Sequence, residues 1–367
     1  MKKRLGIIIL LGLTIIGRAQ ETAFHPTITR ATLEGRASYH LYFLNGAQNQ
    51  EDSGFKGNYL QFLFSLDITP KLHFDYRQRF NKPISISSFF DATDKLLLIY
   101  NPTEQWDLRV GKRPVAIGGC DYAIIPIDLY FTGQYCDLLT IYQWGVSGRY
   151  TTKKGNDSFM IEFTQSPFRT YSTNKNIYAY SFLYEATHGP VDFIYSVNFF
   201  GTETGKYVNW IVLGHRFNIG KKVHIEADVI HKYSIAGKKA TNKNRFLFKD
   251  YSLVGKVIYN PIDQLSLAVK YCYDENSCEY ESIEQQTAEN CDYHVLPGTR
   301  VHRIGGIVEY YPLKGEYRNF IRLHLAGHYD MGVNTDPNGT VLDKQAFLTV
   351  GFTAKLDLLK VKVQKKE

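Results

Sequence analysis

The chain has 367 residues, with 43 Lys and Arg against 36 Asp and Glu, and a formal charge of +7. Four of the basic residues lie in the first eighteen positions, and subtracting them from +7 leaves +3, which is too weak to indicate nucleic-acid binding. Tyr and Phe number 27 and 23, an aromatic content that is typical of the interface girdles of membrane β-barrels. After residue 20 no stretch approaches the ~18 uncharged apolar residues that a membrane-spanning helix needs.

The N-terminus has the pattern of a secretory signal peptide. Basic residues at positions 2–4 precede an apolar run over 5–16, and small residues precede a cut after Ala19. The alternative is a buried N-terminal helix, which the basic start and the small-residue exit disfavour. The predicted divisions of the chain are a signal peptide over 1–19, a short segment over 20–30 and a β-barrel domain over 31–367.

Apolar and polar residues alternate with period two through most of the mature chain. A clear example places Leu60, Phe62 and Phe64 on one face and Gln61 and Ser65 on the other. The pattern predicts about sixteen strands, near 31–44, 55–68, 72–81, 95–101, 106–113, 139–151, 157–165, 177–187, 190–200, 207–217, 222–233, 248–259, 264–274, 301–311, 317–329 and 345–358. In the fourth, residues 96–100 are apolar throughout, and in the tenth either set of alternate residues could face the barrel interior.

The connections between the predicted strands alternate in length. Tight turns, such as those at Pro70 and Gly189, are followed by longer polar connections over 81–94, 114–139, 234–248, 274–300 and 330–344. Alternation alone would also fit a soluble β-sandwich, but short turns at one end and long loops at the other are typical of outer-membrane barrels. We therefore predict an all-β, closed transmembrane antiparallel β-barrel, wide enough for an aqueous channel instead of a filled core.

Charged residues at inward positions form two groups. If apolar residues face lipid, the basic side chains of the first six strands and of strands 12 to 15 point inward and form one continuous wall. Acidic residues such as Glu162, Asp192, Glu226 and Asp228 occupy the strands between. A basic wall across water from an acidic one favours anions, although the charges could also simply pair with one another. The residues predicted to line the pore and attract anions are Arg36, Arg77, Arg79, Arg109, Arg113, Lys270 and Arg322.

The segment Trp106-Asp107-Leu108-Arg109-Val110-Gly111-Lys112 runs from a strand directly into the loop over 114–139. In this motif and in its strand pattern the chain resembles the phosphate-selective porin O and P family of bacterial outer membranes. The resemblance implies a trimer of sixteen-stranded channels with basic residues along the anion route. The chain departs from the family by ending in Lys-Lys-Glu instead of an aromatic residue, and by having no dense lysine cluster.

The loop over 114–139 is apolar and aromatic for a surface loop. By analogy with porins, it is predicted to fold into the barrel and to narrow it, with Tyr122, Asp128 and Tyr130 at the constriction. The alternative is a loop that covers a contact between subunits. Because an exported protein meets an oxidising compartment, a disulfide between Cys120 and Cys136 is predicted.

A second pair of cysteines lies in the loop over 274–300. Cys278 and Cys291 are predicted to form a disulfide there, which leaves Cys272 at an inward strand position. Pairing of Cys272 with Cys278 or with Cys291 remains an alternative. The loop itself is interpreted as a stapled surface loop.

The expected function is passive diffusion of small hydrophilic solutes through a bacterial outer-membrane porin, with a mild preference for anions, phosphate among them. The chain contains no GxSxG, P-loop or CxxC motif, so no enzymatic activity, metal or cofactor is expected. The expected partners are outer-membrane lipid, small anionic or neutral solutes and two further copies of the chain in a homotrimer, and no nucleic acid. The alternative is a non-conducting barrel that serves as a scaffold or receptor subunit of a cell-envelope complex.

Overall fold

The computed structural model describes residues 24–82, 89–136, 139–169, 176–203, 206–234, 249–277, 298–333 and 341–359. The predicted signal peptide and the predicted Cys278–Cys291 pair lie outside these residues. In the ranges just given, no helix is long and apolar enough to cross a membrane.

The described chain is almost entirely extended. Short 3₁₀ helices occur only in connections: η1 (Phe89–Asp91), η2 (Pro126–Asp128), η3 (Gln134–Cys136) and η7 (Gly315–Phe320). The strands are β1 (Thr27–Leu44), β2 (Ala47–Gln48), β3 (Gly54–Thr69), β4 (Leu72–Arg79), β5 (Thr93–Thr103), β6 (Trp106–Pro114), β7 (Tyr142–Thr151), β8 (Asp157–Gln165), β9 (Tyr178–His188), β10 (Val191–Glu203), β11 (Lys206–Ile219), β12 (Val223–Ser234), β13 (Asp250–Ile262), β14 (Leu265–Asn276), β15 (Arg300–Tyr310), β16 (Ile321–Val333) and β17 (Gln345–Asp357).

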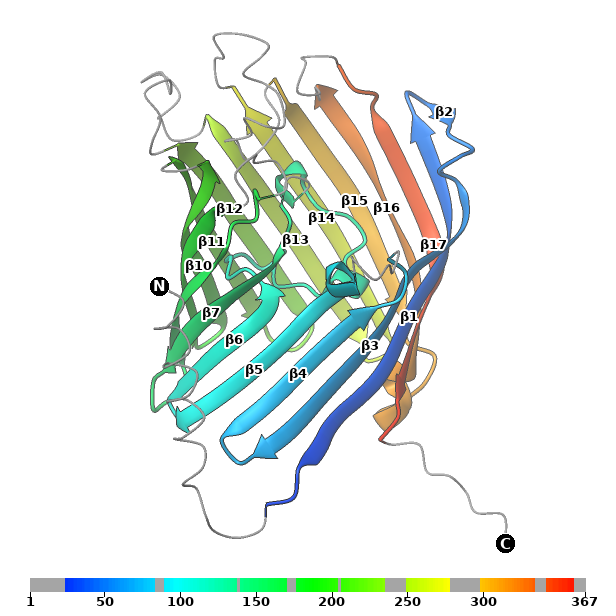
Figure 1. The fold of residues 1–367 in the computed structure, drawn as a ribbon. Helices are drawn as coiled ribbons and strands as arrows, with labels where there is room; N and C mark the ends of the chain where they lie inside the picture. Colours follow the sequence, from blue (N-terminus) through cyan, green and yellow to red (C-terminus); the bar gives the residue numbers. More distant parts are fainter. Residues whose placement is uncertain are drawn as a thin grey trace, which may run out of the picture.

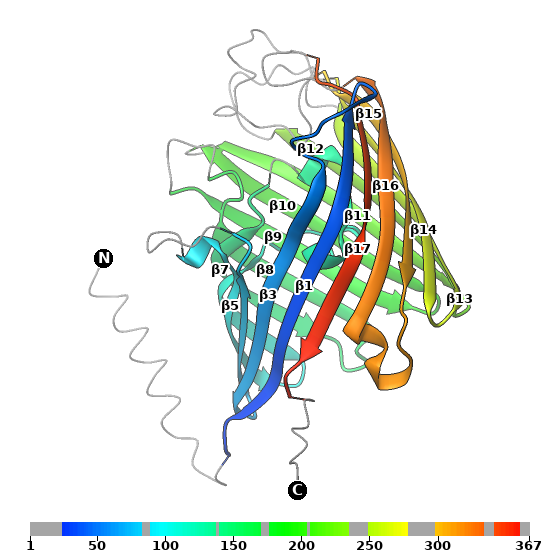
Figure 2. The same cartoon turned by 90° about the vertical axis from the view of Figure 1, so that its right-hand side faces the viewer.

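Apart from the two-residue β2, the strands form one closed antiparallel barrel (Figure 1, Figure 2). Each long strand pairs with the next along the chain, and β1 closes the ring by pairing with both β3 and β17. Arg36 of β1, for example, lies opposite Tyr59 on one side and Thr353 on the other. The predicted all-β antiparallel barrel of sixteen strands is therefore confirmed.

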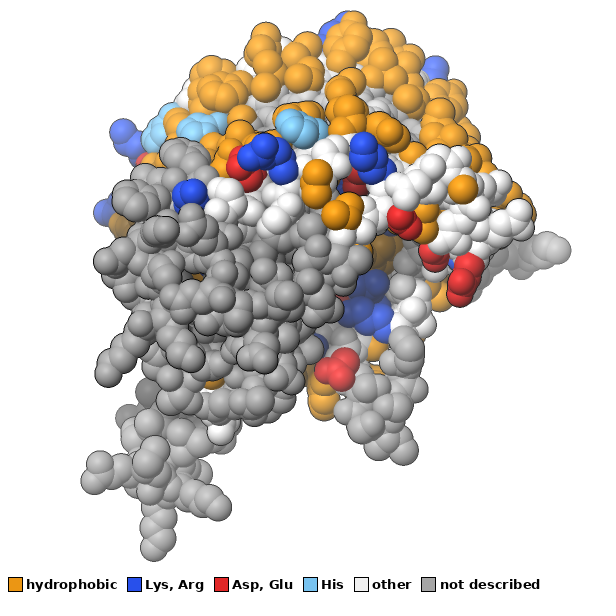
Figure 3. Space-filling model, turned by 90° about the horizontal axis from the view of Figure 1, so that it is seen from above, with side chains coloured by type: hydrophobic (Ala, Val, Ile, Leu, Met, Phe, Trp, Pro, Cys, Tyr) orange, Lys and Arg blue, Asp and Glu red, His pale blue; other side chains and the backbone are white. Residues whose placement is uncertain are grey.

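Apolar side chains cover the outer face of the barrel. Val110, Ile161 and Val350 are 51, 62 and 52% exposed, although they lie in the middle of paired strands. Seen from above, hydrophobic side chains follow the outer rim (Figure 3). Inward positions such as Gln61 and Ser196 are polar and buried. The period-two pattern of the sequence is thus an outside–inside pattern of the barrel.

For two predicted strands the structure decides which residues face inward, and for a third it corrects the first residue of the strand. The fourth predicted strand is β5, where Leu97 is buried inside and Leu98 is exposed outside. The tenth is β11, where Trp210 faces inward and Leu213 outward. The strand predicted over 317–329 begins only at Ile321, because residues 315–320 form η7 in a longer connection.

One side of the barrel interior contains a hydrophobic core. Inward side chains of β9 to β14 pack there against Phe168 and against the connection between β6 and β7. The expectation of an aqueous interior without a filled core is therefore wrong for this side, because β11 carries apolar residues at successive inward positions. The core residues are Val115, Ile117, Tyr135, Phe168, Ala179, Phe200, Val208, Trp210, Val212, Ile230, Val254 and Cys272.

Candidate functional site: the barrel interior

The connection between β6 and β7, described over 115–136 and 139–141, lies inside the barrel and is called the inner loop below (Figure 1). The first half of this loop is held by carboxylates on β8 and β12. The backbone N–H of Ala116 donates to Glu162 Oε2 on β8 at 2.6 Å. The backbone N–H groups of Cys120 and Asp121 donate to the two oxygens of Asp228 on β12, at 2.7 and 2.8 Å. Glu162 and Asp228 were predicted to belong to an acidic wall facing water, but both carboxylates accept hydrogen bonds from the backbone of this loop instead.

Glycines let the inner loop approach the wall closely. A Cβ added to Gly214 of β11 would lie 2.7 Å from the Cα of Gly119, and one added to Gly118 would lie 2.7 Å from the backbone oxygen of Ile194 on β10. At this contact the backbone N–H of Gly118 donates to the hydroxyl of Ser196 at 2.8 Å. The loop is therefore seated on β10 and β11 at backbone distance, where no larger residue would fit.

A buried lysine holds the middle of the inner loop. Lys270 on β14 is 1% exposed, and its Nζ lies 2.6 Å from Asp121 Oδ1 and 2.7 Å from the carbonyl oxygen of Phe131. The ammonium also lies 5.1 Å from the centre of the Phe131 ring. A charge this deeply buried is stabilised only when it is fully paired, so Lys270 is a structural anchor of the loop.

Two arginines hold the next part of the inner loop. Arg36 on β1 donates to the carbonyl oxygens of Ile127 and Leu129, at 2.9 and 3.0 Å. Arg322 on β16 forms a 2.6 Å ion pair with Asp128. Through these contacts the loop reaches round the wall from β8 to β1 and leaves the side formed by β3 to β7 uncovered.

Tyr130 and Tyr122 were predicted, with Asp128, to lie at the constriction. The Tyr130 hydroxyl donates to Glu309 on β15 at 2.9 Å, so this side chain faces the wall. The Tyr122 hydroxyl donates to the carbonyl oxygen of Val115 at 3.0 Å and its ring lines a cavity beside β6. Of the three residues, Tyr122 is the one that lines this cavity, and the side chain of Asp128 is 39% exposed.

The predicted anion-attracting residues therefore divide into two groups. Arg36, Lys270 and Arg322 hold the inner loop. The remaining four lie on β4 and β6, on the uncovered side: Arg77, Arg79, Arg109 and Arg113.

Three cations surround a single buried carboxylate on the uncovered side. Asp94 is 1% exposed, and its oxygens lie 3.6 Å from Arg77 Nε, 4.0 Å from Arg79 Nε and 3.5 Å from Lys82 Nζ. Aromatic faces hold the cationic groups in place, since Arg79 lies 4.5 Å from the ring centre of Tyr59. Three positive charges against one negative charge leave a local excess of positive charge.

The other two arginines are paired one to one. Arg109 forms a 2.7 Å contact with Asp107, its neighbour but one on β6. Arg113 lies 3.3 Å from Glu162 and donates to the hydroxyl of Ser147 at 3.0 Å. The alternative considered for the sequence, that lumen charges pair with one another, thus describes β6 better than β4.

A cavity of about 500 Å³ separates the inner loop from the uncovered side, and it is called the lumen cavity below. Two carboxylates, Asp75 and Glu185, line it together with six basic residues: Arg30, Arg77, Lys95, Arg109, Arg113 and Arg149. Its opposite side is apolar. That side comprises loop residues such as Ile124 and Ile125. Leu63 on β3 and Leu97 on β5 also line the cavity, but beside the basic residues, and Leu183 lines it from β9.

The predicted disulfide between Cys120 and Cys136 is wrong, because Cys120 is a free thiol. The two residues are held by different strands. The backbone N–H of Cys120 donates to Asp228 on β12. The backbone N–H of Gln134, two residues before Cys136 in η3, donates to Asp274 on β14 at 2.9 Å. Cys272 is likewise a free, buried thiol, in the hydrophobic core.

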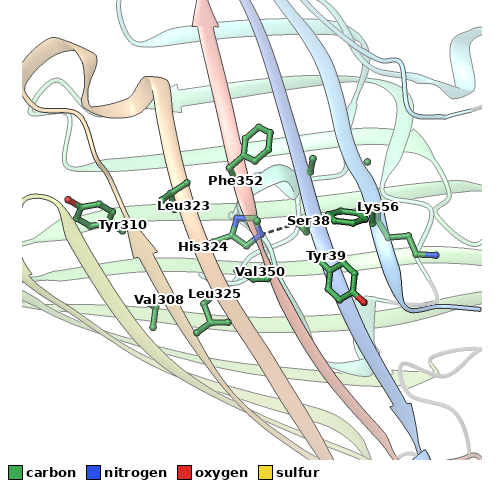
Figure 4. Close-up of a pocket in the computed structure, with 14 residues that line it drawn as sticks. Ser38, Tyr39, Lys56, Val308, Tyr310, Leu323, His324, Leu325, Val350 and Phe352 are labelled. Carbon is green, nitrogen blue, oxygen red and sulfur yellow. Dashed lines mark hydrogen bonds between the residues drawn. The ribbon is translucent and has the colours of Figure 1, made fainter. Parts of the chain in front are cut away.

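A Ser–His pair bears on the question of enzymatic activity. The hydroxyl of Ser38 and Nε2 of His324 lie 3.0 Å apart, across Gly351 of the strand between them, as the dashed line in Figure 4 shows. Both side chains are buried, and Nδ1 of His324 has no hydrogen-bond partner among the residues described. A nucleophile needs an oriented base and access to substrate, so this pair is read as a bridge between β16 and β1.

A groove of about 690 Å³ lies over the strands that carry this pair, and Ser38 and His324 border it (Figure 4). It is lined mainly by outward side chains of β15, β16, β17, β1 and β3, including Val308, Leu325 and Phe352. Its lining is almost wholly apolar, so it belongs to the outer surface and not to the solute path.

Sequence reasoning missed Asp94, Lys82 and Asp121. The first two lie in the predicted connection over 81–94 and the third in the loop over 114–139, and alternation assigns no orientation within connections. The only available signal was an acid just before a predicted strand whose residues are apolar from Leu96 to Tyr100. Its partners, on another strand, cannot be read from spacing.

No protein-family profile and no curated protein matches this sequence. Solved outer-membrane proteins share its fold. The outer membrane channel DcaP of Acinetobacter baumannii is 11% identical, with a TM-score of 0.56 over 92% of this chain and 99% of that one. An anion-selective porin from Comamonas acidovorans, also 11% identical, has a TM-score of 0.59 over 90% and 100%. The trimer form of in-vitro folded OmpT of Vibrio cholerae, 11% identical, has a TM-score of 0.57 over 91% and 100%. These likenesses establish the porin fold, and the resemblance to the O and P family stays a prediction.

Proposed function

We propose that this protein is a bacterial outer-membrane porin, a passive diffusion channel for small hydrophilic solutes with a mild preference for anions. A closed barrel with an apolar outer face and a polar inner face is suited to lipid, because every strand has two partners and no backbone edge is exposed. The fold shared with outer-membrane channels supports the same location. Export through the signal peptide over 1–19 is part of the proposal.

The observation that carries the anion preference is the cluster around Asp94. Arg77, Arg79 and Lys82 share this one carboxylate on the side of the barrel that the inner loop leaves uncovered. In a narrow space with low-dielectric walls, an excess of fixed positive charge raises the local concentration of anions. Phosphate is one candidate anion among several, since no dense lysine cluster is present.

The test is the conductance of the refolded protein in a planar bilayer with a potassium chloride gradient across it. Stepwise conductance with a reversal potential that favours chloride is expected. A reversal potential that favours potassium would overturn the anion preference and leave the porin. Correctly folded barrels without any conductance would overturn the porin and favour the scaffold or receptor subunit, a function that the hydrophobic core inside the barrel also suits.

Replacing Asp94 with Asn should make the channel more selective for anions. The substitution keeps the shape of the side chain but leaves Arg77, Arg79 and Lys82 without their shared counter-charge, so the chloride-to-potassium permeability ratio should rise by roughly two- to fivefold. Reversal potentials in the same salt gradient measure this ratio. Asp263→Asn, in the short connection between β13 and β14, is the matched control and should leave it unchanged. A ratio that falls in Asp94→Asn would contradict the charge assignment.

Reversing two charges on β4 and β6 should have the opposite effect. In Arg77→Glu/Arg109→Glu, the uncovered side becomes acidic, and the reversal potential should change sign toward potassium. Arg318→Glu is the control, because Arg318 lies in η7 at the barrel end, where its guanidinium stacks on Tyr311. Unchanged selectivity in the double variant would remove these arginines from the solute path.

A homotrimer is part of the proposal and is supported by the trimer form of OmpT, which shares the fold. Light scattering of the detergent-solubilised protein tests it by mass. A mass of three chains is expected, and a mass of one chain would overturn the trimer without affecting the channel.

A further inference from the structure

The lumen cavity has two sides of unlike chemistry. Its basic side, on β1 and β4 to β7, is lined by six cationic side chains. Lys95 and Arg149 are paired with the lining carboxylates Asp75 and Glu185, at 2.9 and 2.6 Å, whereas Arg77 shares the single carboxylate of Asp94 with two other cations. Its apolar side faces this across the gap, and Ile125 on the inner loop is 43% exposed there. A channel for inorganic anions alone needs the basic side, but the apolar side makes no favourable contact with such ions.

Apolar residues line the cavity from the strands as well as from the loop. Leu63 on β3, Leu97 on β5 and Leu183 on β9 point inward around it, and none of the three belongs to the hydrophobic core described above. The loop presents Ile124 and Ile125 opposite the basic side. An aliphatic group that is exposed near guanidinium groups, as Ile125 is, costs free energy in water, and such a combination in a concave site is characteristic of ligand pockets.

We propose that the lumen cavity binds carboxylates that carry a compact apolar body, such as an alicyclic or branched aliphatic group, on their way through the channel. The carboxylate contacts the basic side, where the half-buried guanidinium groups of Arg109 and Arg149, each paired with one carboxylate, line the cavity. The apolar body packs on Ile124 and Ile125. The volume of about 500 Å³ is within the ~300–1,000 Å³ of small-molecule pockets. This inference rests on the proposed function, whose solutes it narrows to amphipathic organic anions.

Isothermal titration calorimetry of the protein in lipid nanodiscs tests the binding step directly, with empty nanodiscs as the blank. The probes are cyclohexanecarboxylate, acetate, cyclohexanemethanol and inorganic phosphate. Cyclohexanecarboxylate should bind at least about tenfold more tightly than each of the others, because it alone uses both sides of the cavity. Equal affinity for acetate or phosphate would overturn the apolar contact, and equal affinity for cyclohexanemethanol would overturn the ionic contact.

Loop variants locate the apolar contact. Ile125→Ser should reduce the affinity for cyclohexanecarboxylate by about five- to tenfold and leave that for acetate unchanged. Leu129→Ser is the matched control, since Leu129 lies in the same loop but not in the lining of the cavity. An equal loss in both variants, or no loss in Ile125→Ser, would place the binding site elsewhere.

Conductance separates this inference from the proposed function. Suppose that the channel conducts chloride, and that cyclohexanecarboxylate and acetate block the current at similar concentrations. The proposed porin function would then be supported, and the amphipathic binding site would be overturned. If the barrel binds cyclohexanecarboxylate in nanodiscs but conducts no ions, the binding site would be supported as a receptor site and the porin function would be overturned. Selective block of chloride current that Ile125→Ser relieves is the result that we expect.

Discussion

Replacing Lys270 with Met is expected to free the middle of the inner loop and to raise the single-channel conductance. The substitution removes the ammonium that binds Asp121 and the carbonyl oxygen of Phe131, and it leaves the buried Asp121 carboxylate without a counter-charge. Breaking one partner of a buried pair costs about 3–5 kcal/mol. Because the loop is not part of the strand pairing, that cost should appear as displacement of the loop and larger, noisier conductance steps, with β-sheet content by circular dichroism unchanged.

Two further variants make this result specific. Lys256→Met is the matched control, because Lys256 lies directly opposite Lys270 in the pairing of β13 with β14 but contacts Glu226 at 3.7 Å instead of the inner loop. In Lys270→Met/Asp121→Leu both charges are absent, and the loop should return, since an apolar pair of similar volume is tolerated where a lone charge is not. Equal conductance in wild type and Lys270→Met would show that the loop is held without the lysine.

Replacing Gly214 with Val should prevent the inner loop from seating on β11. The added Cβ would lie 2.7 Å from the Cα of Gly119 and 3.0 Å from the backbone nitrogen of Cys120, so the loop must move. Valine favours the extended backbone of a strand, and the barrel itself should form normally. The variant therefore separates docking of the loop from folding of the barrel.

The thiol of Cys120 reports on this docking. It is fully buried in the docked loop, and burial, reinforced by Asp228, raises the pKa of the Cys120 thiol, which keeps it protonated and unreactive. A water-soluble maleimide should therefore label Cys120 at least about tenfold faster in Gly214→Val than in wild type. Peptide mass spectrometry identifies the labelled cysteine.

A glycine two strands away, on β13, supplies the control for this experiment. Gly255 of β13 has open space at the position of an added Cβ, so Gly255→Val should leave Cys120 unlabelled. Rapid labelling of Cys120 in wild type, or slow labelling in Gly214→Val, would show that the contact between Gly214 and Gly119 does not hold the loop.

The arrangement of the interior gives the two sides of the barrel different tasks. From β8 round to β1, inward charges and glycines serve the inner loop, and a hydrophobic core fills the space behind it. From β3 to β7 the wall is free, and basic residues there face the lumen cavity. We expect selectivity to depend on the second group, while the first group determines how wide the path is.

The sequence alone determined the barrel, its strand number and the direction of most side chains. In strands such as β3 the orientation of Phe62 and Gln61 follows from a strict period of two, and the alternation of short turns with long connections indicates antiparallel neighbours. These are local properties, because each residue's environment depends on its immediate neighbours along the chain. The phase of β5 and β11 was not determined, since apolar residues occupy both of their faces there.

Only the tertiary structure decided what each inward charge does. Arg36 and Arg77 look alike in the sequence, yet Arg36 binds Ile127, 91 positions away, while Arg77 shares Asp94 with two other cations. The same holds for Cys120, which was assigned to a disulfide but is held apart from Cys136 by contacts to separate strands. The physical reason is that the sequence of the inner loop has no periodic alternation of apolar and polar residues. The position of the loop depends on ion pairs, backbone hydrogen bonds and glycine contacts with strands far along the chain, which no local pattern in the sequence reveals.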